Sequence, residues 1–442
     1  TAFLQEPENG NVLLGKRSEE VHTYPGHWAA ISGSIEEAGP EAQALTEIRE
    51  ETGLSQSEVM LHGRGQPVRF TDWELGTRWV VHPFLFRCEA PEDIRRDWEH
   101  ARFRWVAPDD IRELCTVPKL WEAWCSACQA AEDGGVTSDD RIFRRVCDDR
   151  EHGAEELGLW ALDGLLGALN RLAEEADSVE SLADGMEQAC RSAASLRPSM
   201  APPVTAALEA SRVVRRCVSN KEGGAARVAE RIRDGLRQVL WQREAAPLQA
   251  ASAAAEVLPK GAHVVTLSYS STVLAALHAS TDRVERVTIG ESRPACEGRR
   301  TACRAASFGL PTELVTDAAA ANAVRWADVV LLGADAVLED GTVVNKMGSF
   351  ALGAAAQVSG GMVVVVTTES KIMPAGREIE HEEMSPDELG EPIEGVETRN
   401  VYFESVPERL LEVLVGESGS LRQSDVRECA RARERASRRL GP

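Results

Sequence analysis

The spacing of apolar residues changes twice along the chain. Up to about Cys128, short apolar segments such as NVLLGKR, HWAAISG and VVHPFLFRCEA alternate with turns and one helical stretch. This pattern is typical of an α+β unit. Between about Ile142 and Leu248 the period is helical, as in LGLWALDGLLGALNRLA. In that stretch four leucines recur at helical spacing: Leu159, Leu162, Leu166 and Leu169.

After about Val257 the period becomes that of short buried strands. Five β-branched runs follow, and helical segments separate most of them: HVVTLS, RVTIG, TELVTD, DVVLLGAD and MVVVVTT. Strands that alternate with helices predict a parallel, doubly wound sheet with right-handed crossovers. In such sheets ligands bind at the carboxyl ends of the strands.

A chain of 442 residues exceeds one ordinary domain, so we predict a multidomain protein. The predicted parts are an α+β domain (1–128), a linker (129–145), an α-helical subdomain (146–250), a doubly wound, Rossmann-like α/β domain (251–418) and an arginine-rich tail (419–442). The linker contains the acidic, glycine-paired stretch AAEDGGVTSDD. The polar tail is expected to be mobile or a weak helix.

Charge and composition narrow the function. The formal net charge of −22 argues against strong nucleic-acid binding, because phosphate binding needs a basic face. No apolar run is long enough to span a bilayer and no signal pattern opens the chain, so we expect a cytoplasmic protein without membrane contact. The ten cysteines lack framework spacing, and the pair Cys125 and Cys128 is expected to pack on a helix rather than to bind zinc.

The stretch from Gly33 to Leu54 carries the first candidate site. Glu47, Glu50 and Glu51 have the spacing i, i+3 and i+4, which places their carboxylates on one face of a helix that Gly53 would end. Such carboxylates form an oxygen cage for magnesium or manganese, and a bound cation can neutralise a pyrophosphate and activate water. The alternative is a solvated acidic face.

The segment TEIREETGL resembles the core of the Nudix box: Arg-Glu, apolar, any, Glu-Glu, any, Gly. This resemblance implies a Nudix fold and a hydrolase of nucleoside diphosphates linked to another moiety. It also implies that Glu47, Glu50 and Glu51 are metal ligands, one of them also acting as base. Thr46 stands where the family's arginine normally orients the glutamates, and Glu36 and Glu37 could replace a glutamate that is missing near Gly39.

The second candidate site lies in the C-terminal part. Four polar clusters fall where strands are predicted to end: SYSST, GESRP, GADAV with NKMGS, and TESK. Hydroxyls and amides at a helix start cradle anions, while Arg293, Lys346 and Lys371 add cationic donors for phosphate. Asp335 follows an apolar strand, where partial burial could raise its pKa enough to carry a proton.

These clusters resemble the family that joins ribose 1,5-bisphosphate isomerase, methylthioribose 1-phosphate isomerase and the alpha, beta and delta subunits of translation initiation factor 2B, over about residues 146–418. By resemblance, Asp335 is the acid. The substrate-binding residues implied are Ser270, Ser271, Thr272, Arg293, Asn345, Lys346, Lys371, Arg197 in SLRPS, and Gly153 and Ala154 in HGAEEL. In that last loop the family's arginine is His152 and a glycine is Glu155.

In the isomerases, a cysteine at the position of Ser268 moves the proton during aldose-to-ketose conversion. A hydroxyl has a pKa far above neutrality, so Ser268 needs a partner base. Two explanations stay open: a domain that binds a phosphorylated ribose or nucleotide with little or no isomerisation, which we favour, or an isomerase with another base. The different-class alternative is a regulatory partner of translation initiation factor subunits. The family resemblance also implies a homo-oligomer through the C-terminal domain.

Overall fold

The structure is a computed structural model, and it divides the chain into two compact units, Thr1–Val136 and Thr137–Pro442. The residues that it describes are 1–7, 9–35, 39–72, 75–132, 138–148, 153–197, 200–219, 224–377, 383–391, 393 and 395–441. Glu36, Glu37 and His152 lie outside these ranges. Each unit is described by itself.

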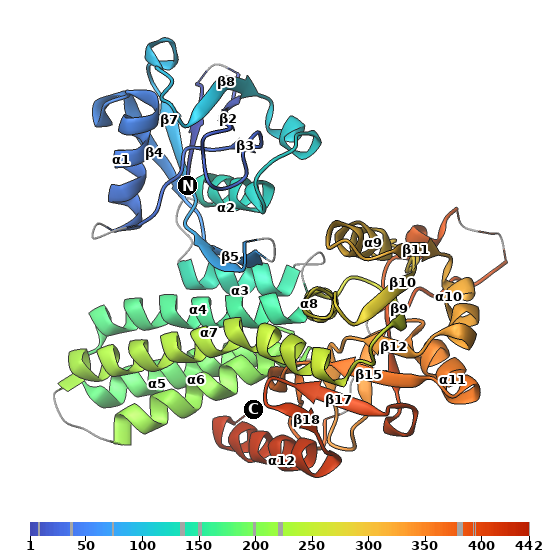
Figure 1. The fold of residues 1–442 in the computed structure, drawn as a ribbon. Coiled ribbons are helices and arrows are strands. Elements are labelled where there is room, and N and C mark those ends of the chain that lie inside the picture. The colour runs from blue at the N-terminus through green and yellow to red at the C-terminus, as the bar shows by residue number, and fades with distance from the viewer. Residues whose placement is uncertain are drawn as a thin grey trace. The chain divides into compact units, whose positions relative to one another are not determined.

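The first unit is built on a mixed sheet (Figure 1). Its strands run in the order β3 (Trp28–Ala29), β2 (Val12–Arg17), β1 (Ala2–Gln5), β7 (Phe84–Cys88) and β4 (Val59–Arg64), and β8 (His100–Val106) also pairs with β2. Strands β1 and β7 are parallel, and the other pairs are antiparallel. A separate hairpin joins β5 (Val68–Asp72) and β6 (Thr77–Val81).

Period-two alternation divides the side chains of this sheet between two cores. Phe3 and Leu14 pack with the apolar face of α2 (Leu120–Glu132), which includes the two cysteines of WCSAC. Their neighbours Leu4 and Leu13 pack with α1 (Pro40–Thr52). The sheet therefore lies between two helices, and α1 is the helix that carries the acidic motif.

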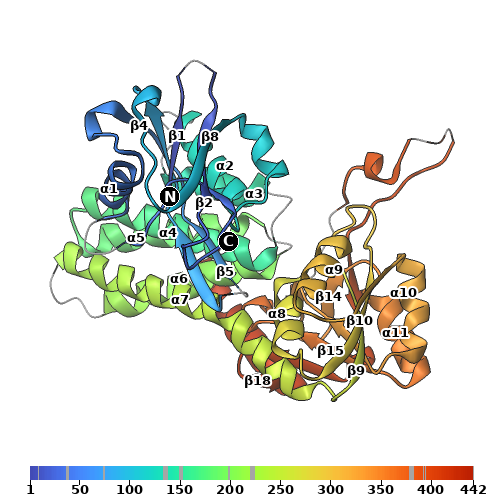
Figure 2. The ribbon, with the colours of Figure 1, turned by 45° about the horizontal axis from the view of Figure 1, so that its top comes forward.

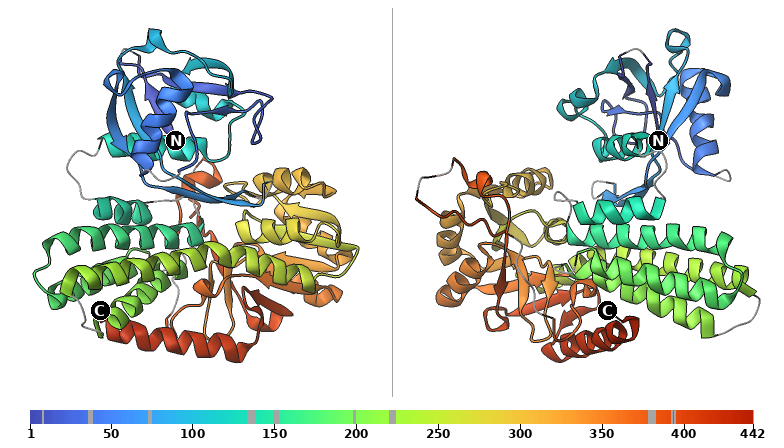
Figure 3. Two further views of the ribbon diagram at one scale, coloured as in Figure 1. Left: turned by 60° about the vertical axis from the view of Figure 1, so that its left-hand side comes forward. Right: turned by 180° about the vertical axis from the view of Figure 1, so that it is seen from behind.

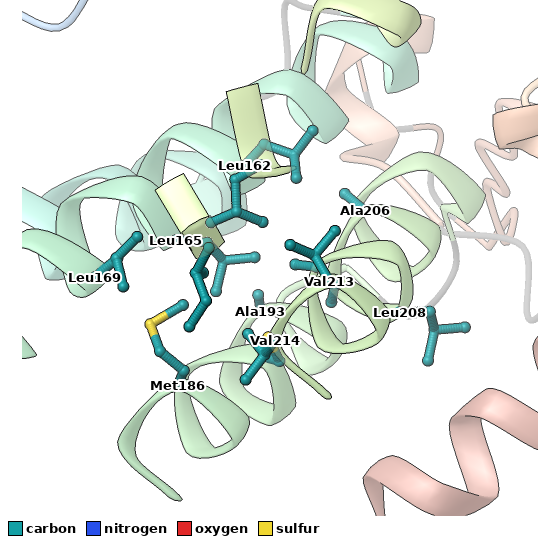
Figure 4. Packing of buried hydrophobic residues seen from close by; sticks show 14 of the residues in the cluster. Leu162, Leu165, Leu169, Met186, Ala193, Ala206, Leu208, Val213 and Val214 are labelled. Carbon is teal, nitrogen blue, oxygen red and sulfur yellow. The ribbon is translucent and has the colours of Figure 1, made fainter. Parts of the chain in front are cut away.

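The second unit begins with a bundle of helices (Figure 3). Its members are α3 (Ser138–Asp148), α4 (Ala154–Glu175), α5 (Val179–Ser195), α6 (Ala201–Ser219) and α7 (Gly224–Val257). In its core Leu162, Leu165 and Leu169 of α4 lie near Met186 of α5 (Figure 4). Leu159 and Leu166 are partly buried at the border of the same core, as their helical spacing predicted.

The bundle continues into a seven-stranded sheet. Its order is β11 (Thr312–Val315), β10 (Val284–Gly290), β9 (Ala262–Leu267), β12 (Val329–Leu332), β15 (Met362–Val366), β17 (Val413–Gly416) and β18 (Gly419–Leu421). All neighbours are parallel except β17 and β18. The five predicted β-branched runs supply β9, β10, β11, β12 and β15, whereas β17 and β18 were not predicted.

Helices lie against both faces of this sheet (Figures 1 and 2). Helices α8 (Ser271–Ala279) and α9 (Gly298–Ser307) follow β9 and β10, and α10 (Asp317–Ala323) and α11 (Ser349–Ser359) belong to the other layer. From β9 the chain proceeds outward to β10 and β11, then returns to β12 on the other side of β9. The strand order therefore reverses between β9 and β12, which is where sheets of this type bind ligands.

A smaller antiparallel sheet joins β13 (Ala336–Val337), β14 (Val343–Lys346) and β16 (Phe403–Val406). It follows directly from the end of β12, so it brings the NKMGS segment back toward that edge. The arginine-rich C-terminal segment forms β18 and α12 (Gln423–Leu440), where Val426 and Ala430 are buried. Within the described part of the chain, no helix combines the length and apolarity needed to cross a membrane.

Candidate functional sites

The acidic motif occupies the last two turns of α1. Gly53 ends the helix in the left-handed conformation, with φ of 76°, and its N–H donates to the carbonyl of Arg49. This agrees with the predicted role of the glycine. The carbonyl end of a helix carries a partial negative charge, so carboxylates placed there are destabilised unless a cation is near.

Glu51 is the most buried carboxylate of the motif, with 3% of its surface exposed. Its Oε1 accepts a hydrogen bond of 3.0 Å from the N–H of Ser32, while its Oε2 is buried without a hydrogen-bond partner. Burial raises the pKa of Glu51 to about 9, the Ser32 N–H opposes this, and the carboxylate of Glu47 adds to it. An ionised Glu51 therefore requires a positive charge that these contacts do not supply.

Glu47 lies beside Glu51 and is half-buried. Gln43 Nε2 donates to Glu47 Oε1 at 2.7 Å. The carboxylate also packs against the bare Cα of Gly33: a methyl group there would lie 1.9 Å from Glu47 Oε1. The sequence therefore needs glycine at position 33 because the carboxylate occupies that space.

Glu50 is placed differently. Its side chain is 62% exposed, and its Oε1 lies 4.0 Å from Arg49 Nη2. Across the described ranges, no three His, Cys, Asp or Glu side chains are grouped so that they could hold a metal ion. The structure therefore brings Glu47 and Glu51 together and leaves Glu50 at the surface. Thr46, which stands at the arginine position, donates its hydroxyl to the carbonyl of Ala42 within the helix.

His100 was missed by the sequence reasoning. It opens β8, and its Nε2 lies 3.5 Å from Glu51 Oε2, an ion pair if the imidazole is protonated. Its Nδ1 contacts Asp97 Oδ1 at 3.0 Å. No local spacing could have linked His100 to a helix about fifty residues earlier, because strand pairing brings β8 into this sheet.

Two of the three glutamates have the chemistry of divalent-cation ligands. Glu51 Oε2, which accepts no hydrogen bond, and the adjacent Glu47 carboxylate are hard oxygen ligands of the kind that magnesium and manganese prefer. Glu47 and Glu51 would hold such an ion, with Glu50 available from the same helix.

The second site lies where the strand order reverses. Ser268 follows β9 with a positive φ of 62°, and its N–H donates to Ser292 Oγ at 2.6 Å. Its carbonyl accepts from Thr301 Oγ1 at 2.5 Å. Asp317 accepts hydrogen bonds from the N–H groups of Ser292 and Arg293, at 2.7 and 2.9 Å. The loops after β9 and β10 are thus tied together, and the Arg293 side chain is left exposed.

The three hydroxyl residues after Ser268 differ in role. Ser270 caps α8, because its hydroxyl accepts from the N–H of Val273 at 3.3 Å. Thr272 is buried in the first turn, and Ser271 is exposed. A methyl group at Gly333, after β12, would lie 2.8 Å from Ser270 Oγ, so the ends of β9 and β12 are adjacent at the reversal. The start of α8 therefore faces that point.

Asp335 follows β12 at the same edge and is half-buried. Burial raises its pKa, and the charges of Lys371 and Lys346 oppose this, while Glu297 adds to it. Lys346 and Lys371 are buried, with 4% and 6% of their surfaces exposed. The structure thus brings together the predicted acid and both predicted lysines.

Lys346 is already paired. Its Nζ lies 2.8 Å from Glu297 Oε1 and 3.7 Å from the ring centroid of Tyr402. Asn345, its neighbour on β14, donates Nδ2 to Ser349 Oγ at 2.9 Å. Glu297 was not predicted as a site residue, although it stands only four residues after Arg293 of the GESRP cluster. Its involvement depends on β14, which the sequence pattern did not reveal.

The predicted phosphate loop is described from Gly153 onward. Gly153 caps α4 and is exposed, and Ala154 is buried in the first turn. Glu155 accepts hydrogen bonds from Thr368 Oγ1 at 3.0 Å and from Ser370 Oγ at 2.7 Å, both beside Lys371. Arg197 lies just after α5, with 6% of its surface exposed.

Fold and sites define a protein of two parts: a mixed-sheet unit with a carboxylate-bearing helix, and a helical bundle joined to an α/β sheet with a polar site at its strand reversal. Residues 1–125 match the NUDIX domain model. Residues 150–423 match the model of the Initiation factor 2 subunit family, and because this match spans more than half of the chain, the chain belongs to that family.

Individual relatives agree with this assignment. The chain is 27% identical over 269 residues to ribose 1,5-bisphosphate isomerase of Haloferax volcanii, covering 58% of this chain and 81% of that protein. It is 34% identical over 158 residues to methylthioribose-1-phosphate isomerase of Pseudomonas putida GB-1, covering 33% of this chain and 44% of that protein.

Among solved structures, the translation initiation factor eIF-2B of Pyrococcus horikoshii OT3 is similar, with a TM-score of 0.51 and 26% identity. The match covers 64% of this chain and 96% of that one. The predicted pairing of a Nudix region with an initiation-factor-2B-like α/β region is therefore confirmed. A Nudix domain makes the chain a predicted hydrolase, and the second family includes isomerases.

Proposed function

We propose that the protein is a metal-dependent Nudix-type hydrolase of a nucleoside diphosphate-linked compound, fused to a domain that binds a phosphorylated ribose or nucleotide. The observation that carries the first half is Glu51: a buried carboxylate at the negative end of α1, beside Glu47, with an oxygen that has no hydrogen-bond partner. Such a group is stable as an anion only beside a cation.

In this proposal Glu47 and Glu51 hold magnesium or manganese, and Glu50 joins them. The bound ion would neutralise the pyrophosphate and lower the pKa of the attacking water. The Ser32 N–H fixes one oxygen of Glu51, while Gln43 and Gly33 fix the position of Glu47. These contacts hold the two carboxylates in place before the substrate binds.

The test is magnesium-dependent hydrolysis of ADP-ribose-like compounds. Replacing Glu50 and Glu51 together by glutamine should abolish hydrolysis, because both substitutions remove charge from the metal-binding face and keep the side-chain size. The exposed Glu89→Gln variant of the same unit is the matched control. Full activity of the double variant would remove these glutamates from the mechanism.

For the C-terminal unit we propose a doubly wound, Rossmann-like domain with its site at the reversal between β9 and β12. The strand order, the α8 N-terminus and the burial of Lys346 and Lys371 near Asp335 support this proposal. The site would bind the sugar and phosphate through the predicted residues: Gly153, Ala154, Arg197, Ser270, Ser271, Thr272, Arg293, Asn345, Lys346 and Lys371. Asp335 would serve as the acid.

Ser268 limits the chemistry of that site. Its backbone is fixed by Ser292 and Thr301, neither of which is a base. We therefore propose binding with little or no isomerisation. Hydrolysis in the first unit would release a ribose phosphate or a nucleoside monophosphate, and the second domain would use or sense that product.

The alternative is a regulatory subunit that works with translation initiation factors. The likeness to eIF-2B of Pyrococcus horikoshii favours it, as does the fold likeness to a tetrameric eIF2B-beta2-delta2 complex of C. thermophilum, at a TM-score of 0.54 and 17% identity. A stable complex with an initiation-factor subunit on purification would support this alternative. A homo-oligomer formed through the C-terminal domain, which consumes small phosphates, would support the enzyme.

A further inference from the structure

The site of the second unit contains carboxylates that already occupy its anion-binding groups. Lys346 is within 2.8 Å of Glu297 Oε1, and both groups lie mostly away from solvent, with 5% and 24% of their side chains exposed. Glu297 Oε2 is buried and has no hydrogen-bond partner. The positive charge of Lys346 is therefore neutralised within the chain before any ligand arrives.

A second carboxylate, that of Glu155, occupies hydrogen-bond donors next to Lys371 in the sequence. Glu155 accepts hydrogen bonds from the hydroxyls of Thr368 and Ser370, which could otherwise donate to a phosphate. Lys371 itself makes no ion pair or side-chain hydrogen bond with the described residues. Its charge acts on the Asp335 carboxyl but is not held in an ion pair with a described residue, so Lys371 is the lysine of this cluster that can pair with a ligand.

The charges of the cluster match one phosphate group better than two. Within the buried cluster, Lys346 and Lys371 contribute two positive charges, Glu297 neutralises that of Lys346, and the Asp335 carboxyl lies in the field of both lysines. A phosphate monoester carries a charge of about −1.5 to −2 near neutral pH. One such group can be held by Lys371 with the N–H groups at the start of α8, but a second would have to approach the buried, unpartnered oxygen of Glu297.

We propose that Glu297 is a specificity-determining residue, which restricts the site to a ribose that carries one phosphate group and disfavours a bisphosphate. This inference rests on the proposed function, since it assumes that the second domain binds phosphorylated ribose. A preference for one phosphate group also suits the first unit, because hydrolysis of a diphosphate linkage to ribose leaves one phosphate on the sugar.

The test is isothermal titration calorimetry of the full chain, in EDTA so that the first site is silent. The ligands are ribose 5-phosphate and ribose 1,5-bisphosphate. We expect the monophosphate to bind at least about ten-fold more tightly. Glu297→Gln frees Lys346 and should improve bisphosphate affinity by about ten-fold or more, whereas Glu297→Asp keeps the charge and should keep the preference.

Glu285→Gln is the matched control, because Glu285 is an exposed glutamate on β10, near its amino end and away from the site. Equal or tighter binding of the bisphosphate by the wild-type chain overturns the inference and leaves the proposed function standing. An unchanged ratio in a folded Glu297→Gln variant also overturns it. If neither ligand binds, the ribose-binding part of the proposed function fails and the inference with it, while the hydrolase part is not affected. If the Glu297→Gln variant does not fold, the ratio of the two ligand affinities in the wild-type chain alone decides the inference.

Discussion

Replacing Glu51 by glutamine should have opposite effects on stability and activity. In the metal-free protein, burial raises the pKa of Glu51 from 4.5 to about 9. At pH 7 the unfolded chain releases this proton and the folded chain keeps it. The difference costs the folded state about 3 kcal/mol at pH 7 and about 6 kcal/mol above pH 9.

The sign follows from the raised pKa. The stability contribution of Glu51 is fully present below pH 4.5 and is lost as the pH rises toward about 9. Glutamine does not titrate and has nearly the same shape. In EDTA at pH 7, Glu51→Gln should therefore be more stable than the wild type by up to about 3 kcal/mol, or on the order of 10 °C in the melting temperature of a unit of this size.

Magnesium should reverse this order, because the bound ion places a double positive charge beside ionised Glu51. Scanning calorimetry of the full chain with EDTA or magnesium measures the effect, and hydrogen exchange of the α1 amides assigns it to the first unit. Glu89→Gln, an exposed substitution, should change stability by less than about 0.5 kcal/mol. A Glu51→Gln variant that is less stable than the wild type in EDTA at pH 7 would refute the reasoning.

Three further outcomes are expected. Ser268→Cys should raise the rate of aldose-to-ketose conversion of ribose phosphates about 100-fold, because a thiolate can act as base near neutral pH. Phosphorus NMR measures the conversion, and no gain would show that the lack of a thiol at position 268 does not limit it. Burial raises the pKa of Glu417 to about 7, so the Glu417→Gln substitution should stabilise the second unit by up to about 3 kcal/mol at pH 8 and should have no such effect at pH 4. Urea denaturation measures both values, and equal effects at the two pH values would contradict this. Leu165→Ala should cost about 3 kcal/mol in the same assay, since Leu165 is fully buried in the helical core, and a loss under 1 kcal/mol would argue against that packing.

Much of the fold could be predicted from local patterns. The end of α1 at Gly53 and the five β-branched strands follow from period, composition and turn chemistry, which are properties of neighbouring residues. Strand β17 was missed because VLVG is short and continues the mixed stretch PERLLE without a turn signal between them. For the segment of α12 the pattern predicts either a mobile tail or a weak helix, because its many arginines obscure the small apolar stripe that Val426 and Ala430 bury.

The candidate sites could likewise be predicted only where local spacing determines them. Glu47 and Glu51 share a face because i, i+4 spacing fixes it, but their burial relative to Glu50 depends on the sheet beneath α1. His100 and Glu297 could not be predicted, since strand pairing and the β14 sheet bring them to their partners. Long-range pairing carries that information, and residue spacing does not.

The central claim is tested most directly by phosphorus NMR of the full chain with ADP-ribose and magnesium. The account predicts that the pyrophosphate resonances disappear and are replaced by two phosphomonoester resonances, with the wild type active and Glu51→Gln inactive. Pyrophosphate resonances that persist with magnesium and with manganese, in the wild type as in the variant, would contradict it.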